Sequence, residues 1–291
     1  MIVAQQLLNG VVMGSLYVLV ALGLTLVYGV LVQINFAHAD IVTVGAFAAY
    51  FYMHVLGGSY LVAILVALLV GGALGWLINV AIFEPLRAKR SELLPLIATI
   101  GVSVMMQNGM LAWFGPVPYA FETQYSNEVL KFGGMFITWQ NLLIITVSTI
   151  AIGLLYLFMR FTFLGKALRA VAQDRDTAGL MGINQSQVIM LTFVIASAFA
   201  GMGGAMLGPI LVLTPFAGAS VIVKAFAIVI IGGFGNMEGT ILAGILVGLI
   251  ESFTTQYLDP GWTDLVVFGL LLATLAFRPT GLIAESTEEN V

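Results

Sequence analysis

The stretch RFTFLGKALRAVAQDRDTAGLMGIN, residues 160–184, is the main basic interruption in a chain otherwise made of long apolar runs. It holds four of the ten Lys and Arg residues: Arg160, Lys166, Arg169 and Arg175. This charge is too costly to bury in lipid. The pattern predicts a helix over 166–173, a break, and a capping arrangement at Asn184 and Gln187 that starts the next helix.

The predicted 166–173 helix has two faces. We expect Leu168, Val171 and Ala172 on one face, and Arg169 and Gln173 on the other. A compact helical loop rich in small residues is suited to being gripped by another protein. An amphipathic helix lying on the lipid headgroups would show the same pattern.

The rest of the chain is dominated by apolar residues. Of 291 residues, 60% are hydrophobic and 8% are charged, whereas a soluble domain carries about 25% charged residues. Apolar runs of 18 or more residues are typical of membrane-spanning helices. They are too long and too continuous for the alternating strands of a membrane barrel. We therefore predict an all-α, polytopic transmembrane helical bundle with some broken or half helices.

The predicted spans number eight or nine. They are 7–32, 39–56, 60–83, 94–113, 139–160, 186–207, 219–234, 239–257 and 262–277. The 219–234 run is short and bounded by glycine, so it is either a half-helix or a full crossing. The first run is longer than a signal-peptide core and is interpreted as a retained span. We expect one membrane domain over 1–284 and a short, disordered acidic tail over 285–291.

The positions of Lys and Arg predict the orientation. If nine spans alternate, eight of these ten residues fall on one side: Arg87, Lys89, Arg90, Arg160, Lys166, Arg169, Arg175 and Arg278. Cytoplasmic loops carry such an excess. The N-terminus is therefore expected outside and the C-terminus in the cytoplasm. The 114–138 loop is then the largest external feature, and it is either a connector or a docking surface for an external partner.

Two groups of polar residues are candidates for a translocation pathway. The first follows the first span and contains Gln33, Asn35, His38 and Asp40. It either lines a cavity or forms a short loop in which Asn35 or Asp40 caps the next helix. The second is a stripe at helical spacing on the fourth span, formed by Thr99, Ser103, Gln107 and Asn108. It faces either the pathway or polar partners inside the bundle.

Two opposite charges lie inside predicted spans. Lys224 and Glu251 sit at similar depths, and an unpaired charge at the bilayer centre costs about 2.5–3.5 kcal/mol. We therefore predict a buried ion pair, which either locks two helices together or lines the pathway.

Several functions are disfavoured. The chain has no cysteine and only two histidines, so we predict no metal site. It has no G-x-x-x-x-G-K-[ST] phosphate loop and no convincing catalytic constellation. We expect neither a bound cofactor nor enzymatic activity, and no nucleic-acid partner. Glycines spaced four apart, at 10 and 14, 71 and 75, 204 and 208, and 244 and 248, predict close helix packing.

Four stretches resemble one protein family. GKALRAVAQDRDTAGLMGIN at 165–184 is similar to the coupling-helix segment of ABC permeases of the branched-chain amino-acid uptake family, in the smaller permease subunit. The 7–40, 84–108 and 223–251 stretches, with RPTG at 278–281, resemble other parts of the same proteins. The resemblance covers nearly the whole chain.

This resemblance implies a transmembrane half of a bacterial inner-membrane importer. Its partners would be a second, related permease, two cytoplasmic ATPase subunits that use the ATP, a periplasmic solute-binding protein and membrane lipid. The residues at the coupling positions are Lys166, Arg169, Ala170, Ala172, Asp174, Arg175 and Gly182. The family often has two consecutive alanines here, whereas this chain has Thr177-Ala178.

The substrate implied by the resemblance is a branched-chain amino acid. Related permeases resemble carriers of urea, short amides or aromatic acids, and no pocket residue distinguishes among these. A different class, an ion-coupled secondary carrier using Asp40, Glu251 and Lys224, is the alternative.

Overall fold

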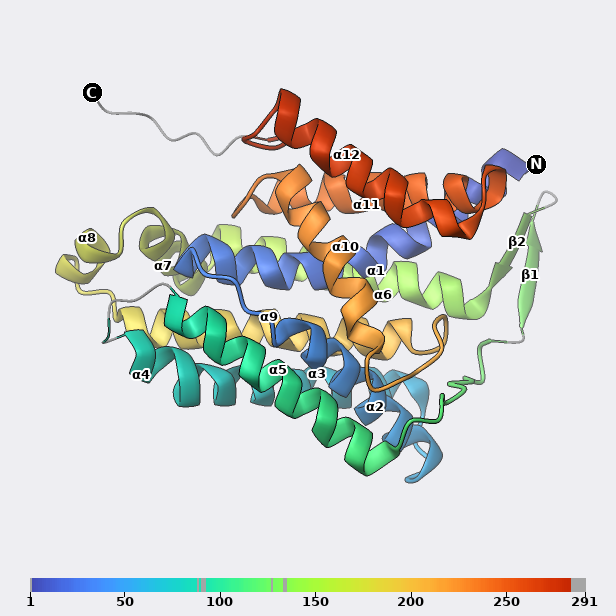
Figure 1. Cartoon of the computed structure of the whole chain (residues 1–291), viewed down its shortest axis with the longest axis horizontal. Helices are drawn as coiled ribbons and strands as arrows, with labels where there is room; N and C mark the ends of the chain where they lie inside the picture. The colour runs from blue at the N-terminus through green and yellow to red at the C-terminus, as the bar shows by residue number, and fades with distance from the viewer. Residues whose placement is uncertain (1, 88, 90–92, 127, 133–134, 284–291) are drawn as a thin grey trace.

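The protein folds into a bundle of helices (Figure 1). The structure is a computed structural model, and it describes residues 2–87, 89, 93–126, 128–132 and 135–283. Arg90 and the expected acidic tail at 285–291 lie outside these residues. The helices are α1 (Ile2–Leu31), α2 (His38–His54), α3 (Tyr60–Ile78), α4 (Glu84–Arg87), α5 (Leu93–Phe114), α6 (Trp139–Phe161), α7 (Phe163–Gln173), α8 (Arg175–Leu180), α9 (Gln185–Leu207), α10 (Ala217–Gly232), α11 (Met237–Tyr257) and α12 (Thr263–Phe277). The predicted all-α polytopic bundle is confirmed.

Within the described residues, seven helices are long and apolar enough to cross a membrane. They include a continuous helical stretch, Tyr60–Arg87, in which a π-helical turn at Asn79–Phe83 joins α3 to α4. Two further predicted spans correspond to shorter helices. The 39–56 run corresponds to α2, with 17 residues, and the 219–234 run to α10, with 16. In Figure 1, α10 crosses the long helices steeply.

The predicted 114–138 loop contains a small hairpin. Strands β1 (Val129–Phe132) and β2 (Met135–Thr138) pair antiparallel. The side chain of Gln5, at the start of α1, exchanges two hydrogen bonds with the backbone of Phe136, at 2.8 and 2.9 Å. The hairpin is therefore held against the N-terminal end of α1.

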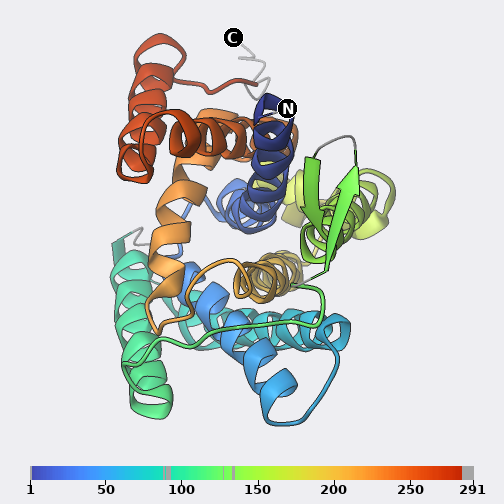
Figure 2. The same cartoon turned by 90° about the vertical axis from the view of Figure 1, so that its right-hand side faces the viewer.

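Helix α1 forms the centre of the bundle. Its residues are buried almost continuously from Gly14 to Val27, as expected for a helix that is apolar on all sides. It packs against α6, α9, α10 and α11. Figure 2 shows α5 and α12 on one side of α1, with α10 between them, and α6 on the other side. Only Pro95 and Thr99 of α5, and Thr263 and Val267 of α12, are buried, so these outer helices leave large apolar surfaces free.

Glycines permit the closest helix contacts. A Cβ atom at Gly14 would lie 2.9 Å from the Cα atom of Ile245, where α1 meets α11. A Cβ atom at Gly204 of α9 would overlap the Val42 carbonyl of α2. The predicted glycine pairs therefore serve packing inside this chain.

The chain turns back into the bundle after α1. Val32 adopts a left-handed conformation, with φ at 53°, which a β-branched residue rarely accepts. The segment that follows brings His38, the first residue of α2, to within 3.2 Å of the Val20 carbonyl, far from the end of α1. Helix α2 therefore begins in the interior of the bundle. Its first turns receive α10, because the Gly218 N–H donates to the Thr43 hydroxyl at 2.9 Å.

Candidate functional site

The 160–184 linker is built from two short helices with side-chain caps. Thr162 accepts a hydrogen bond from the Gly165 N–H and starts α7. Asp174 ends α7 and starts α8, accepting from the N–H groups of Asp176 and Thr177. Gly182, with φ at 84°, follows α8. Asn184 then accepts from the Gln187 N–H at 3.2 Å, which confirms the predicted cap.

The two faces of α7 differ from the prediction at one residue. Gly165, Ala167, Leu168 and Val171 are buried against the bundle, whereas Ala172 is exposed. Ala172 follows Leu168 by four residues and Arg169 by three, so helical spacing places it at the border of the two faces. The way α7 sits on the bundle leaves it on the exposed side. A face of α7 that contains a small residue and flanking charges is thus open to solvent or to a partner.

The predicted coupling residues divide by exposure. Those on the open surface are Lys166, Arg169, Ala172, Asp174 and Gly182, and those half-buried are Ala170 and Arg175. Just before Gly182, Leu180 is 88% exposed and Met181 79% exposed. Two large apolar side chains are therefore exposed beside the charged residues of the linker.

Arg175 fixes the linker to the bundle. Its Nε and Nη2 atoms donate to the carbonyl of Val30 at 3.1 and 2.6 Å. Burial lowers the pKa of the Arg175 guanidinium, which still remains charged because an arginine pKa lies far above neutral. Val30 is two residues before Val32, so α8 is attached to α1 immediately before the chain turns back.

The polar residues after α1 form a buried group. Asn35, His38 and Asp40 are almost completely buried. Asn35 accepts from the Ala37 N–H at 3.1 Å and closes the turn before α2. From α5, Thr99 accepts from the Phe36 N–H at 3.4 Å. The structure thus brings the first polar group and part of the α5 stripe together.

The α5 stripe is only partly involved. Ser103 and Gln107 approach the Asp40 carboxylate, and Gln107 also donates to Ser103 at 3.1 Å. Asn108 is exposed and donates to the carbonyl of Val104 in its own helix. Gln33 is half-buried beside Asn35, in a small crevice between α1 and α10. Neither Asn108 nor Gln33 lies against Asp40 in the way that Ser103 and Gln107 do.

This polar group is not fully hydrogen-bonded within the described residues. Asn35 Nδ2, His38 Nδ1 and Asp40 Oδ2 are buried atoms without a partner there. Each such atom costs about 1–3 kcal/mol relative to a paired one. The start of α2 therefore contains several buried polar atoms whose hydrogen-bonding capacity the described residues do not fill.

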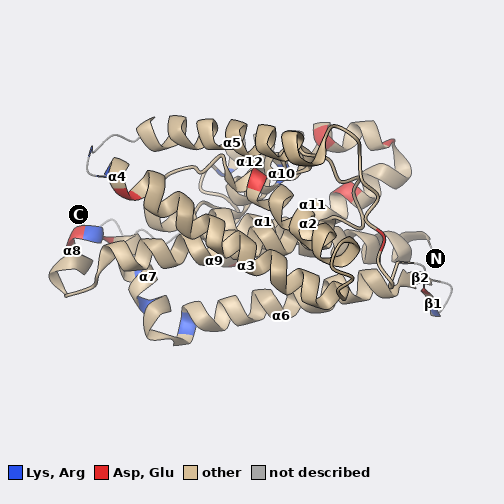
Figure 3. Ribbon diagram, turned by 90° about the horizontal axis from the view of Figure 1, so that it is seen from below, with Lys and Arg blue, Asp and Glu red and all other residues tan. Residues whose placement is uncertain are grey.

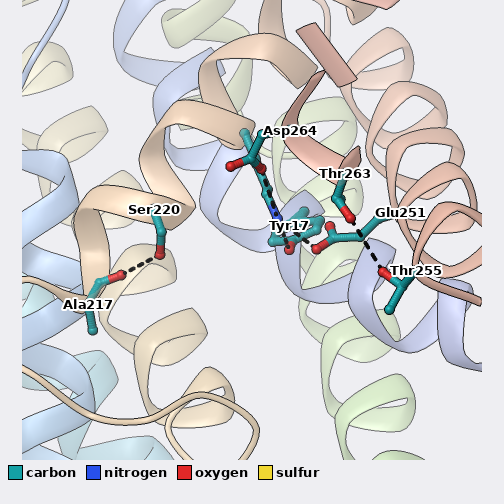
Figure 4. A network of polar contacts seen from close by, with 8 residues as sticks. Tyr17, Ala217, Ser220, Glu251, Thr255, Thr263 and Asp264 are labelled. Atoms are coloured by element: carbon teal, nitrogen blue, oxygen red, sulfur yellow. Dashed lines mark hydrogen bonds and ion pairs between the residues drawn. The ribbon is translucent and has the colours of Figure 1, made fainter. Parts of the chain in front are cut away.

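The two predicted membrane charges are in contact. Lys224 Nζ of α10 lies 2.6 Å from Glu251 Oε1 of α11, and the two side chains are 15% and 16% exposed. Lys224 also donates to the Tyr17 hydroxyl at 3.3 Å and lies 3.7 Å from Asp264 Oδ1 of α12. Figure 4 shows this network, which joins α1, α10, α11 and α12.

Two members of this network, Tyr17 and Asp264, were missed from the sequence. Asp264 falls in the first turn of α12, where an acidic residue is ordinary for a helix start. Tyr17 lies in a long apolar stretch of α1, two residues after Ser15. Its hydroxyl group within that stretch was the only feature of the sequence that could have indicated a polar contact.

Comparison with known proteins gives the family. Residues 6–275 match the family described as "Branched-chain amino acid transport system / permease component". The chain belongs to this family. Permease protein BraD of the high-affinity branched-chain amino acid transport system of Pseudomonas aeruginosa is 34% identical over 300 residues, covering 99% of this chain and 97% of BraD. LivH of Escherichia coli K12, with the same description, is 34% identical over 301 residues, with the same coverage.

A second permease type is also related to this chain. LivM of Salmonella typhimurium, described as a permease protein of the high-affinity branched-chain amino acid transport system, is 23% identical over 297 residues, 93% of this chain and 68% of LivM. No solved structure gives a significant match. This family member is therefore a multi-pass membrane permease component and not an enzyme.

Proposed function

We propose that this chain is the membrane-spanning permease subunit of an ATP-driven importer of branched-chain amino acids. The observation that carries the proposal is 34% sequence identity, over 99% of this chain, to relatives named as high-affinity branched-chain amino acid transport permeases. Urea, short amides and aromatic acids remain alternative substrates. The permease itself has no phosphate loop, so partner ATPases would bind the ATP.

The 160–184 linker is the proposed contact with the ATPases. Its support is the exposed face of α7 around Ala172, the open apolar side chains Leu180 and Met181, and the firm attachment of α8 through Arg175. A segment that couples an ATPase to the bundle needs both a free surface for the ATPase and a rigid connection to the helices that it moves. In this chain the connection leads to the end of α1 and from there to α2.

The proposed transport step uses this connection. ATP binding would bring the ATPases together and shift α7 and α8 as one body. Arg175 would transmit the shift to Val30, and so to the segment that places Asn35, His38 and Asp40 inside the bundle. Repacking of these incompletely bonded residues would open the bundle alternately to either side.

The proposed orientation places the linker in the cytoplasm and the N-terminus outside. Lys and Arg gather at the end of the bundle that carries α4, α7 and α8 (Figure 3). Strand β1, which contains Lys131, lies at the other end. Such an excess is typical of cytoplasmic ends. A bacterial inner membrane is the expected location.

The proposed partners follow from this orientation. A second permease, related as LivM is, would complete the pathway, and the free surfaces of α5 and α12 are available for it. A periplasmic binding protein would deliver the solute at the outer end, where the 114–138 segment lies.

Transport in reconstituted vesicles tests the proposal. We expect leucine uptake that requires the second permease, the ATPases, the binding protein and ATP. Ala172→Glu should abolish uptake and leave the yield of folded permease unchanged, because residue 172 is exposed. Gly182→Arg is a poorer test, since the positive φ of Gly182 disfavours any side chain. Uptake by the permease alone, driven by a proton gradient, would instead support an ion-coupled carrier.

A further inference from the structure

A cavity of about 500 Å³ lies beside α7, and its lining includes Arg169 and Ala172 of the face proposed to meet the ATPases. Its walls come from α1, α6, α7 and the first turn of α11. Three charged side chains line it: Arg160, Arg169 and Glu238. The remaining wall is partly apolar, with Leu26 and Met159 among its residues. A cavity with two cations, one anion and an apolar wall fits a ligand that is itself zwitterionic and amphipathic.

The charged groups are connected and still have donors to spare. Arg160 Nη1 donates to the Tyr156 hydroxyl at 2.9 Å, and Tyr156 donates to Glu238 Oε1 at 3.3 Å. Arg169 Nη1 donates to the Met159 carbonyl. A guanidinium has five N–H groups, so both arginines retain donors for an anionic ligand. Glu238 retains acceptor capacity for an ammonium group.

The position of the cavity points to lipid. It lies between the ends of α6 and α11, both of which pack against α1. Figure 2 places α6 on the side of α1 opposite α5 and α12. The outward face of α6 carries exposed apolar side chains, including Leu154 and Leu157, directly before Arg160. Charged residues at the end of an apolar, outward-facing helix lie at the depth of lipid headgroups.

We propose that this cavity binds the headgroup of an aminophospholipid. The phosphate is held between Arg160 and Arg169, the ammonium group is held by Glu238, and the acyl chains run along α6. A purely anionic headgroup would offer Glu238 no cationic group, only the Tyr156 hydroxyl that it already accepts from. A choline headgroup has no N–H to donate to it. Because Arg169 belongs to α7 and Arg160 to α6, a bound lipid would also hold the linker against the bundle.

Lipid binding to the purified full-length chain tests this proposal. The delipidated protein in detergent is titrated with phosphatidylethanolamine and with phosphatidylcholine of the same acyl chains, and bound lipid is counted by native mass spectrometry. We expect about tenfold tighter binding of phosphatidylethanolamine, the effect of one charge-assisted hydrogen bond. Glu238→Gln should remove this preference, and Arg160→Gln should weaken the binding of both lipids. Glu122→Gln, an exposed residue in the 114–138 segment, is the matched control and should change neither.

Two results would overturn the proposal. Equal affinities of the unaltered chain for the two lipids would exclude recognition of the ammonium group, and this comparison decides even if Glu238→Gln does not fold. Binding of water-soluble glycerophosphoethanolamine as tight as that of the lipid would mean that the ligand is a soluble zwitterion and not a membrane lipid. Neither result depends on transport, so this proposal can fail while the proposed function stands.

Discussion

Arg175 and Val30, 145 residues apart in sequence, are joined by two hydrogen bonds from the guanidinium to one carbonyl. The carbonyl belongs to the last turn of α1, where backbone acceptors lack helical partners. The strained Val32 and the return of the chain toward α2 follow immediately. One side chain therefore connects the linker helices to the interruption between α1 and α2.

Replacing Arg175 tests this connection. We expect Arg175→Ala to lower the free energy of unfolding by about 1.5–3 kcal/mol, the range for hydrogen bonds to charged groups. Uptake should fall further than stability explains, while ATP hydrolysis by the partners continues. Arg175→Lys should recover little, because lysine lacks the planar fork. The exposed Lys166→Ala is the control for stability. Normal uptake by Arg175→Ala would show that the connection transmits nothing.

The Lys224–Glu251 pair predicts a pattern of single and double variants. Removing one partner, as in Lys224→Met, should destabilise the protein by about 3 kcal/mol, because the Glu251 carboxylate then stays buried without a cation. The double variant Lys224→Met/Glu251→Leu should recover most of this loss. A charge swap is less informative, since a carboxylate at position 224 would face Asp264. Chemical unfolding in detergent measures the free energy of unfolding of the two single variants and of the double variant. Additive losses in the double variant would contradict a stabilising pair.

Two glycine substitutions should change the stability of the protein differently. Gly204→Ala places a methyl group against the Val42 carbonyl, and such overpacking costs about 1–3 kcal/mol. Gly101→Ala, in the outer helix α5, meets nothing within 4 Å. It should be neutral or stabilise by up to about 1 kcal/mol through helix propensity. Thermal unfolding of both variants checks the prediction, and equal effects would contradict the described contact of α9 with α2.

The cap of α8 predicts a dependence on pH. A hydrogen bond from the Thr177 hydroxyl, together with backbone N–H groups, lowers the pKa of the Asp174 carboxyl below its ordinary value. The cap therefore stabilises α8 fully above pH of about 4, the ordinary Asp value. This stability is lost as the pH falls through the lowered pKa. The protection factors for amide hydrogen exchange in residues 175–180 should therefore fall only in that acidic range. Asp174→Asn, which caps without titrating, should remove the dependence, and an unchanged acidic profile in this variant would contradict the assignment.

Much of the bundle was predictable because it depends on local pattern. Apolar runs longer than a bilayer crossing become long helices, and Asn184 caps α9 through Gln187 as the local spacing predicts. The contact of Lys224 with Glu251 followed from their matching depths on antiparallel neighbours. In each case, a short stretch or one neighbouring pair of helices carried the information.

The remaining features depend on tertiary contacts. A hydropathy pattern indicates a helix at 39–56 but not that α2 begins beside Val20, because the path of residues 32–37 is decided by packing on α1 and α5. Ala172 was assigned to the wrong face because the extent of the buried side of α7 depends on its seat on the bundle. The attachment of Arg175 to Val30 had no local signal at all.

The most direct test of the coupling proposal uses the absence of cysteine from the chain. A single Leu180→Cys substitution at the exposed end of α8 is combined with a short bifunctional cross-linker in the membrane-embedded complex. Glu122→Cys in the 114–138 segment is the control. We predict that Leu180→Cys cross-links to an ATPase subunit and is not labelled by a membrane-impermeant maleimide added to intact cells. Glu122→Cys should be labelled by the maleimide and should not cross-link to an ATPase subunit. Labelling of position 180 from outside the cell, or no cross-link to an ATPase in a complex active in uptake, would contradict the proposal.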